Sequence, residues 1–310
     1  MSVNLGQKIQ DLYSSFGDLS GITIELHKQL IAVAVHNKSA KATLFLQGAQ
    51  LAEYQRLGEE PVLWMSDQCD FKAGKSLRGG IPICWPWFGN LEFNPEAVKS
   101  QFSGEMPAHG FVREREWSLD RVNSVDEYTT ELFLSLDVEP DPERPFCARL
   151  QLKVSIGQEL ELEFSVSNTG DKTFSFTSAL HTYFSVSHIE RAEIHGLEQK
   201  TYLDTLNGWQ SKTDADDLQI NSEVDRVYPD LNKSTVLKDS GWDRAIQIEA
   251  EHFPDMVVWN PWIDKAKRLS HFADEAYQEM ICMESAQILD NYLTLKPEEQ
   301  FKASIIIRSE

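Results

Sequence analysis

Two ionisable side chains stand in surroundings that are unusual for their type. Glu284 follows the apolar run 280–283, where a carboxylate is expected only if it is paired or functional. His181 lies between Leu180 and Tyr183, and it is either a hydrogen-bonded core histidine or a functional group. A carboxylate and an imidazole that titrate near neutrality can exchange protons with a substrate. Because 103 positions separate them, only the fold could bring the two together.

Two arginines stand beside glycines in segments rich in aromatic residues. Arg78 precedes the glycine pair 79–80, which would let the backbone approach a ligand closely. Arg113 follows a His-Gly turn at 109–110. A guanidinium group binds phosphate through two parallel hydrogen bonds and stays charged at any working pH. The two arginines, joined by Lys75, therefore form a candidate phosphate site, with salt bridges to the abundant acidic residues as the alternative.

Common catalytic and cofactor-binding motifs are missing from the sequence. GxGxxG, GxxxxGK[ST], HExxH and GxSxG do not occur, which argues against nucleotide-cradling loops, zinc proteases and serine hydrolases. His181, His188 and His195 recur every seven residues. Odd and even positions of one strand face opposite sides, so His188 could not join the other two around a metal ion. We therefore expect no metal there.

The charge of the chain restricts its partners. Forty-nine acidic and 29 basic side chains give a formal net charge of −20. Such a surface repels nucleic acid and anionic lipid, so we expect neither a nucleic acid nor a membrane as a partner. A phosphorylated small molecule would be repelled as well, so a site for one must concentrate arginine or lysine locally.

The cysteines and the N-terminal segment favour a cytoplasmic location. Cys69, Cys84, Cys147 and Cys282 are widely spread and form no CxxC pair, which is typical of free thiols in a reducing compartment. The N-terminal segment has no basic stretch followed by an apolar one, and the apolar run 31–35 is too short to cross a membrane.

Alternating apolar and polar residues dominate the chain and predict β-strands. The clearest pattern is a hairpin with strands over 150–156 and 160–166 and a turn at 157–158. Further strands are predicted over 22–36, 41–48, 132–138, 173–177, 245–250 and 301–307. Many short strands with few helices indicate packed antiparallel sheets, a sandwich or a barrel. Because no linker divides the chain, we expect one domain over residues 1–310.

The remaining segments predict few helices and two long loops. An amphipathic helix is predicted around Leu5–Tyr13, with short helical turns near 94–102 and 273–279. The segments 78–90 and 257–264 are rich in Trp, Pro and Gly. Proline cannot donate to a central strand ladder, so we predict loops there, at the rim of a site.

Six polar and aromatic blocks give the sequence its resemblance to a known family. They are LRGGIPICWPWFG (77–89), PAHGFVR (107–113), SALHTYF (178–184), EVDRVY (223–228), VWNPW (258–262) and MICMESA (280–286). In this order, from about residue 40 to the C-terminus, they resemble the glucose-6-phosphate 1-epimerase branch of the aldose 1-epimerase superfamily. The resemblance implies a mainly β fold, a large antiparallel β-sandwich of the galactose-mutarotase type, and an isomerase that needs no cofactor.

The resemblance also implies roles for individual residues. It places the catalytic histidine at His181 and the catalytic glutamate at Glu284, and substrate contacts at Arg78, Arg113 and Asp225. Asp225 could instead form a surface ion pair or cap a turn, and His109 is either a loop anchor or a further sugar contact. Ala108 departs from the family, because some members have a glutamine before the histidine.

The implied reaction exchanges the α and β anomers of a hexose 6-phosphate. A base removes the proton of the C1 hydroxyl, an acid protonates the ring oxygen, and the ring opens to the aldehyde. Rotation about C1–C2 and closure on the other face complete the exchange, with the acid and the base reversing roles. Glu284 is the expected base and His181 the expected acid.

Several alternatives stay open at this point. A mutarotase for unphosphorylated aldoses, a non-catalytic sugar-binding protein, and a glycosidase or lyase on a similar sandwich would share many of these features. A glycosidase usually needs two paired carboxylates, and no second acid stands out beside Glu284. We expect a monomer. Four tryptophans could stack on a sugar or simply pack around loops: Trp85, Trp87, Trp259 and Trp262.

Overall fold

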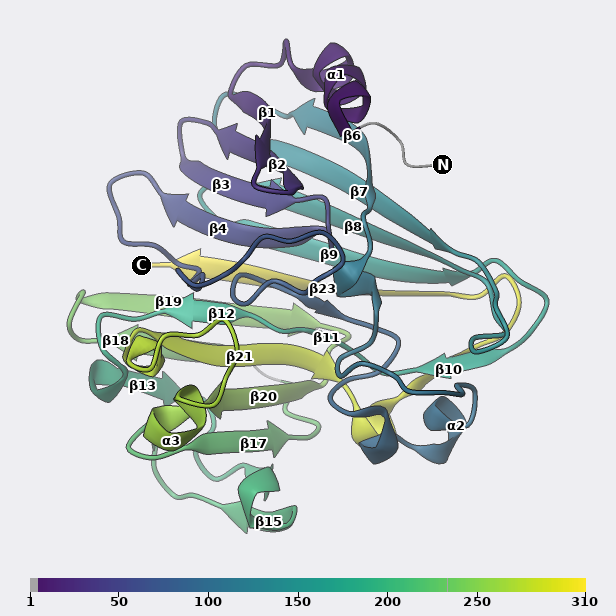
Figure 1. Cartoon of the computed structure of the whole chain (residues 1–310). Coiled ribbons are helices and arrows are strands. Elements are labelled where there is room, and N and C mark those ends of the chain that lie inside the picture. Colours follow the sequence, from purple (N-terminus) through teal and green to yellow (C-terminus); the bar gives the residue numbers. More distant parts are fainter. Residues whose placement is uncertain (1–4, 233) are drawn as a thin grey trace.

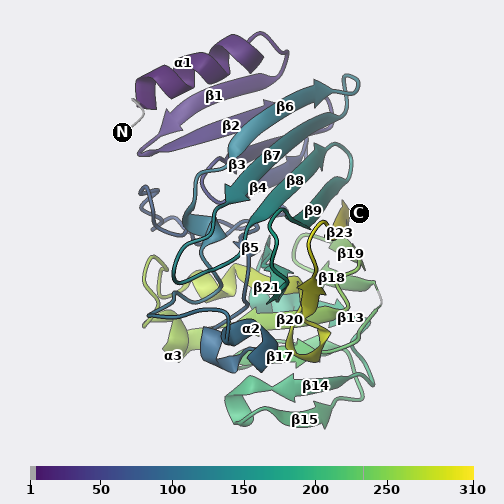
Figure 2. The same ribbon diagram turned by 90° about the vertical axis from the view of Figure 1, so that its right-hand side faces the viewer.

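Most of the regular secondary structure of the protein is antiparallel β-strand (Figure 1). The computed structural model describes residues 5–232 and 234–310. The sheet with the most strands, nine, runs through the molecule. A four-stranded sheet covers one half of it, and an eight-stranded sheet covers the other half (Figures 1 and 2). The mainly β fold and its packed antiparallel sheets are therefore confirmed.

The nine-stranded sheet contains the predicted hairpin. Its strands, in spatial order, are β16 (Leu218–Gln219), β13 (Ala192–His195), β18 (Thr235–Asp239), β19 (Arg244–Glu251), β23 (Gln300–Ser309), β9 (Leu160–Asn168), β8 (Ala148–Ile156), β7 (Thr130–Val138) and β6 (Ser118–Ser124). In β8, buried and less buried residues alternate along the whole strand, and Ile156 pairs with Leu160 across the turn. One face of this sheet thus lies against the core, as its alternating sequence predicts.

The eight-stranded sheet carries most of the blocks identified in the sequence. Its strands, in spatial order, are β15 (Gln210–Thr213), β14 (Thr201–Asp204), β17 (Val224–Tyr228), β20 (Asp255–Asn260), β21 (Met280–Gln287), β11 (Ser178–Leu180) and β5 (Ile83–Cys84), and β12 (Tyr183–Ser185) also pairs with β21. Every residue of β21 is buried. A strand covered on both faces shows a continuous apolar run, which explains the sequence around Glu284.

The smaller elements surround these two sheets. The four-stranded sheet has the order β1 (Ile22–His27), β2 (Leu30–His36), β3 (Ala40–Phe45) and β4 (Gln50–Arg56), and β10 (Phe174–Phe176) pairs with β22 (Leu293–Leu295). The predicted N-terminal helix is α1 (Leu5–Phe16), which lies beside β1 (Figure 2). Short helices are α2 (Glu96–Lys99), α3 (Trp262–Ala266), η1 (Leu91–Phe93), η2 (Val112–Glu114), η3 (Ile189–Arg191), η4 (Thr205–Asn207), η5 (Ala276–Gln278) and η6 (Leu289–Asn291). Among the described residues, none of the helices is long and apolar enough to cross a membrane.

One of the two predicted loops is wrong. The segment 257–264 contains most of β20, which lies between β17 and β21 in the middle of the eight-stranded sheet, and then the start of α3. Pro261 does end the strand, but it lies one residue beyond the last ladder position, where it costs no hydrogen bond. The segment 78–90 is irregular apart from the two residues of β5. The single domain stays a prediction.

Candidate active site

His181 and Glu284 meet because their segments are neighbours in the eight-stranded sheet. The strands β11 and β12 both pair with β21, and His181 lies in the gap between these two short strands. The backbone N–H of Met283 donates to the carbonyl of Thr182 across this gap, at 3.1 Å. The strand pairing therefore places His181 beside Glu284 although they are far apart in the chain.

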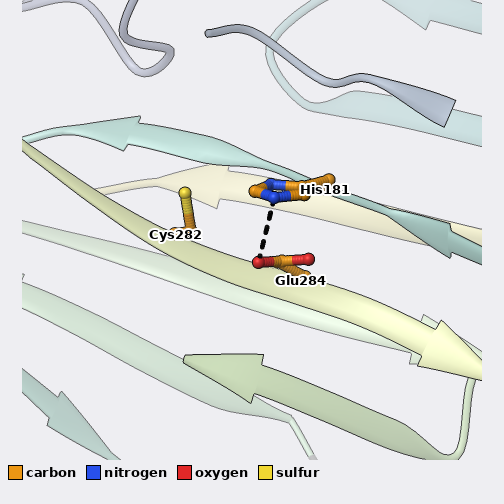
Figure 3. A group of neighbouring side chains, drawn as sticks. All are labelled: His181, Cys282 and Glu284. Atoms are coloured by element: carbon orange, nitrogen blue, oxygen red, sulfur yellow. Dashed lines mark ion pairs between the residues drawn. The ribbon is translucent and has the colours of Figure 1, made fainter. Parts of the chain in front are cut away.

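The two side chains form a buried contact (Figure 3). Nε2 of His181 lies 3.3 Å from Oε1 of Glu284. The residues are 8% and 1% exposed, respectively. Nδ1 of His181 and Oε2 of Glu284 have no hydrogen-bond partner in the described part of the protein. Buried polar atoms are nearly always paired, so these two free atoms indicate a site that is completed by a ligand or water.

Burial and neighbouring charges shift both groups toward their neutral forms. Burial lowers the pKa of His181 to about 3, and the positive charges of Arg113 and Arg78 act in the same direction. Burial raises the pKa of Glu284 well above its usual value, and the carboxylate of Asp225 adds to this effect. These shifts favour a protonated Glu284 next to a neutral His181, so that the two groups share one proton more than a carboxylate next to a neutral imidazole.

A pocket of about 620 Å³ opens above this pair. All six residues singled out in the sequence line it: Arg78, His109, Arg113, His181, Asp225 and Glu284. Its floor is one face of the sheet, where Asp225 pairs with Trp259 and Val257 pairs with Glu284. The fold thus brings these six predicted site residues together in one pocket.

The pocket contains two arginines whose charge is not balanced by a salt bridge. Within residues 5–232 and 234–310, neither Arg78 nor Arg113 forms an ion pair. Arg113 donates from Nη2 to the carbonyl of Ala108 at 2.7 Å, while its buried Nε has no partner. The alternative of structural salt bridges is therefore wrong. Unbalanced guanidinium groups that line a pocket are suited to an anion.

The third cation of the pocket is Lys265, which the sequence analysis missed. It lies in α3 and lines the pocket, with Nζ 3.2 Å from Oε1 of Glu223 and 3.9 Å from Oδ2 of Asp225. Lys75, the predicted third cation, is exposed and is not among the lining residues. A single lysine in a short helix carries no sequence signal of its own, whereas Lys75 stood close to Arg78.

The glycines after Arg78 serve a purpose different from the predicted one. A Cβ on Gly79 would lie 2.6 Å from both Cα of Met65 and the carbonyl oxygen of Trp64, and a Cβ on Gly80 would overlap the carbonyl oxygen of Leu51. Both glycines also have positive φ angles. Their close approach is therefore to neighbouring backbone, not to a ligand, and it fixes the position of Arg78.

Asp225 and His109 also line the pocket. Burial raises the pKa of Asp225, although the charge of Lys265 opposes this shift. Nδ1 of His109 accepts the backbone N–H of Gly89 at 3.3 Å and lies 3.4 Å from Sγ of Cys84. Burial, with the charge of Arg113, lowers the pKa of His109. Its neutral ring therefore carries the proton on Nε2, as a hydrogen-bond donor.

The four tryptophans divide into packing and pocket residues. Trp85 and Trp87 are completely buried, so neither can offer a face to a sugar. Trp262 packs on Tyr277 with ring centroids 5.2 Å apart and does not line the pocket. Only Trp259 lines it. Three other aromatic residues also line the pocket: Phe88, which lies in the predicted rim segment 78–90, and Phe93 and Trp209, which the sequence analysis missed.

Among the residues that the structure describes, two groups of side chains have the spacing of metal ligands. The first group consists of His181, Glu284 and Cys282, and Cys282 lies on the same face of β21 as Glu284 (Figure 3). The second group consists of Glu193, His195 and Asp217. His188 belongs to neither group. Burial raises the pKa of the Cys282 thiol. A neutral His–Glu pair beside a neutral thiol explains why the three side chains of the first group lie so close together. All four cysteines are free thiols.

Comparison with known proteins gives the family of the chain. The chain belongs to the aldose 1-epimerase family, which matches residues 32–308. The chain is 33% identical over 307 residues to a protein of Cenchrus ciliaris, covering 96% of this chain and 88% of the relative. It is 32% identical over 260 residues to a protein of Escherichia coli K12, covering 83% of each. Both relatives carry the name "Putative glucose-6-phosphate 1-epimerase".

Solved structures agree with this assignment. The structure titled "putative mutarotase (YeaD)" from Salmonella typhimurium has a TM-score of 0.84 and 28% identity, covering 94% of both chains. The structure of HI1317 has a TM-score of 0.77 and 27% identity, covering 94% of this chain and 97% of the other. The predicted mutarotase-like sandwich is confirmed.

Proposed function

We propose that this protein interconverts the α and β anomers of a hexose 6-phosphate, with glucose 6-phosphate as the expected substrate. The observation that carries the proposal is a buried His181–Glu284 pair in one pocket with Arg78 and Arg113, neither of which forms an ion pair with any residue that the structure describes. Membership of the aldose 1-epimerase family and the names of the relatives support it.

One shared proton is enough for the whole reaction. When the sugar ring is bound, the active form of the pair is a Glu284 carboxylate and a His181 imidazolium. Glu284 takes the proton of the C1 hydroxyl, His181 gives its proton to the ring oxygen, and the C1–O5 bond breaks. The pair is then a protonated Glu284 and a neutral His181. Closure on the other face reverses both transfers and restores the starting form.

The electrostatics of the pocket favour the protonation state that accompanies the open-chain sugar. Burial and the surrounding charges stabilise protonated Glu284 and neutral His181, which are the forms present after ring opening. The site therefore lowers the free energy of the aldehyde intermediate relative to the bound ring. A phosphate beside the arginines would weaken their effect on His181 and so favour the imidazolium that opens the ring.

The cations of the pocket explain how an acidic protein would bind an anionic sugar. The chain has a formal charge of −20, yet Arg78, Arg113 and Lys265 all line the same pocket. Each charged hydrogen bond to a phosphate contributes about 1.5–3 kcal/mol. Asp225, His109 and the open atoms of the pair remain available for the sugar hydroxyls.

The experiment that tests this function is NMR anomeric exchange, with glucose and glucose 6-phosphate at equal concentration. We expect the protein to accelerate exchange of both anomeric signals of glucose 6-phosphate, and to act less on glucose. No acceleration with either sugar would refute the catalytic function and leave a sugar-binding protein. Faster exchange with glucose would refute the phosphate preference while keeping the epimerase.

A further inference from the structure

Two exposed aromatic residues meet at the mouth of the catalytic pocket. Phe93 and Trp209 are 58% and 39% exposed, and both line the pocket. Their ring centroids lie 6.3 Å apart with planes tilted by 47°, within the range in which aromatic rings attract one another. Leu206, which is 43% exposed, belongs to the same rim. The mouth is therefore bridged by an apolar contact, although the pocket below it is charged.

The two aromatic residues come from separate, well-anchored segments. Trp209 follows Gly208, and both have left-handed backbone conformations. The backbone N–H of Trp209 donates to the carbonyl of Asp204 at 2.9 Å. The Asp204 carboxylate in turn accepts hydrogen bonds from Asn207 and Lys212, each at 2.6 Å. A strained loop held in this way presents the indole at a defined place.

The opposite segment is fixed by a buried asparagine. Asn94, next to Phe93, donates from Nδ2 to the carbonyls of Phe88 and Asn90 at 2.8 and 3.0 Å. Its Oδ1 accepts the hydroxyl of Thr177 at 2.6 Å. Phe93 is therefore held close to Phe88, which itself lies in the pocket wall.

The depth of the reacting groups determines which part of the sugar faces this rim. Glu284 and His181 are buried at the base, so the C1–O5 edge of the sugar must point inward. The opposite C3–C4 edge then points toward the mouth. Aromatic faces pack well against the C–H groups of a pyranose, and exposed apolar side chains at a pocket mouth are typical of ligand contacts.

We propose that Phe93 and Trp209 are positioning residues that close the mouth over the sugar and retain its open-chain aldehyde until the ring closes again. This inference rests on the proposed function. During opening, the C1–O5 bond breaks, and the aldehyde must then rotate about C1–C2 before closure. An open-chain sugar that left at this stage would end the turnover without a protein-bound product. Closing the mouth also excludes bulk water from the proton transfers.

The test measures escape of the aldehyde. Wild type and the variants Trp209→Ala, Phe93→Ala and Trp209→Phe are incubated with glucose 6-phosphate and excess hydroxylamine, which converts any released aldehyde and one hydroxylamine to an oxime and water. We expect oxime formation per anomeric exchange to rise about 3- to 10-fold in both alanine variants, with a similar rise in KM. Trp209→Phe should restore values near wild type, because it keeps an aromatic ring.

A matched control separates this role from general effects. Tyr13→Ala removes an aromatic side chain of similar exposure, 55%, from α1, away from the pocket, and it should change neither quantity. Unchanged oxime yield and KM in both alanine variants would overturn the closure, even if wild type exchanges anomers rapidly. Wild type without any exchange activity would refute the proposed function instead. The two failures are therefore distinguishable.

Discussion

Nε2 of His181 lies 3.3 Å from Oε1 of Glu284, although 103 positions separate the two residues. The contact arises because β11 and β12 both pair with β21 and His181 lies between these two strands, opposite Glu284. The proposed acid and base are therefore direct neighbours. Our proposal uses this contact, because a pair that shares one proton can serve ring opening and ring closure in succession.

The protonation of His181 can be observed directly. With burial and Arg113 lowering its pKa to about 3, the ring is neutral in the free protein from pH 5 to 8. We predict that the ring signals of His181 show no titration over this range in an NMR pH series. Assignment through a His181→Gln variant identifies the signals. A midpoint near the usual histidine pKa of about 6.5 would show that the ring is charged in mild acid, contrary to this account.

The buried carboxyl of Glu284 makes stability depend on pH. Its pKa is raised in the folded protein, so the folded state holds a proton that the unfolded chain loses above about pH 4.5. The contribution of Glu284 to the free energy of unfolding is therefore lost as pH rises, by about 1.4 kcal/mol for each unit by which its pKa is raised. Gln cannot ionise, so the Tm difference between Glu284→Gln and wild type should become more positive from pH 5 to pH 8.

Thermal unfolding at several pH values measures this difference. Glu275→Gln is the control, because Glu275 is exposed and does not line the pocket that contains Glu284. Its Tm difference from wild type should stay nearly constant. A constant difference for Glu284→Gln as well would mean that Glu284 ionises as readily in the folded protein as in the unfolded chain.

The arginines should determine the preference for a phosphorylated sugar. Arg113→Met removes a guanidinium that forms no salt bridge within the described part of the chain. It should lower the ratio of kcat/KM for glucose 6-phosphate to that for glucose about 10- to 100-fold. Lys75→Met is the matched control, since this exposed lysine does not line the pocket. Anomeric exchange rates for both sugars give the ratio. An equal loss with both sugars would place Arg113 at the sugar ring or in the fold, not at the phosphate.

The sequence predicted the strands well where one face of a sheet is solvated. In β8, alternation of buried and less buried residues makes the strand visible. The strand β20 was missed because Val257 and Val258 are both buried, so no alternation remains, and because Pro261 and Trp262 suggested a loop. Periodicity cannot reveal a strand that is covered on both faces.

The site was predicted by its blocks, but its geometry was not. The resemblance identified Arg78, His181 and Glu284, and these residues do share a pocket. Lys265 and Trp209 were missed because each reaches the pocket through long-range folding of a short segment without a motif. The sequence also could not predict that Gly79 and Gly80 pack against neighbouring backbone, because it does not show which part of the chain approaches a glycine.

The most direct test of the acid–base pair is the anomeric exchange rate of Glu284→Gln with glucose 6-phosphate. The variant keeps the size of the side chain but cannot accept the C1 hydroxyl proton. We predict a loss of about 10²–10⁴-fold in kcat, with a folded protein that still binds 1,5-anhydroglucitol 6-phosphate, which has no C1 hydroxyl. Exchange at the wild-type rate in this variant would contradict the role of Glu284 as the base.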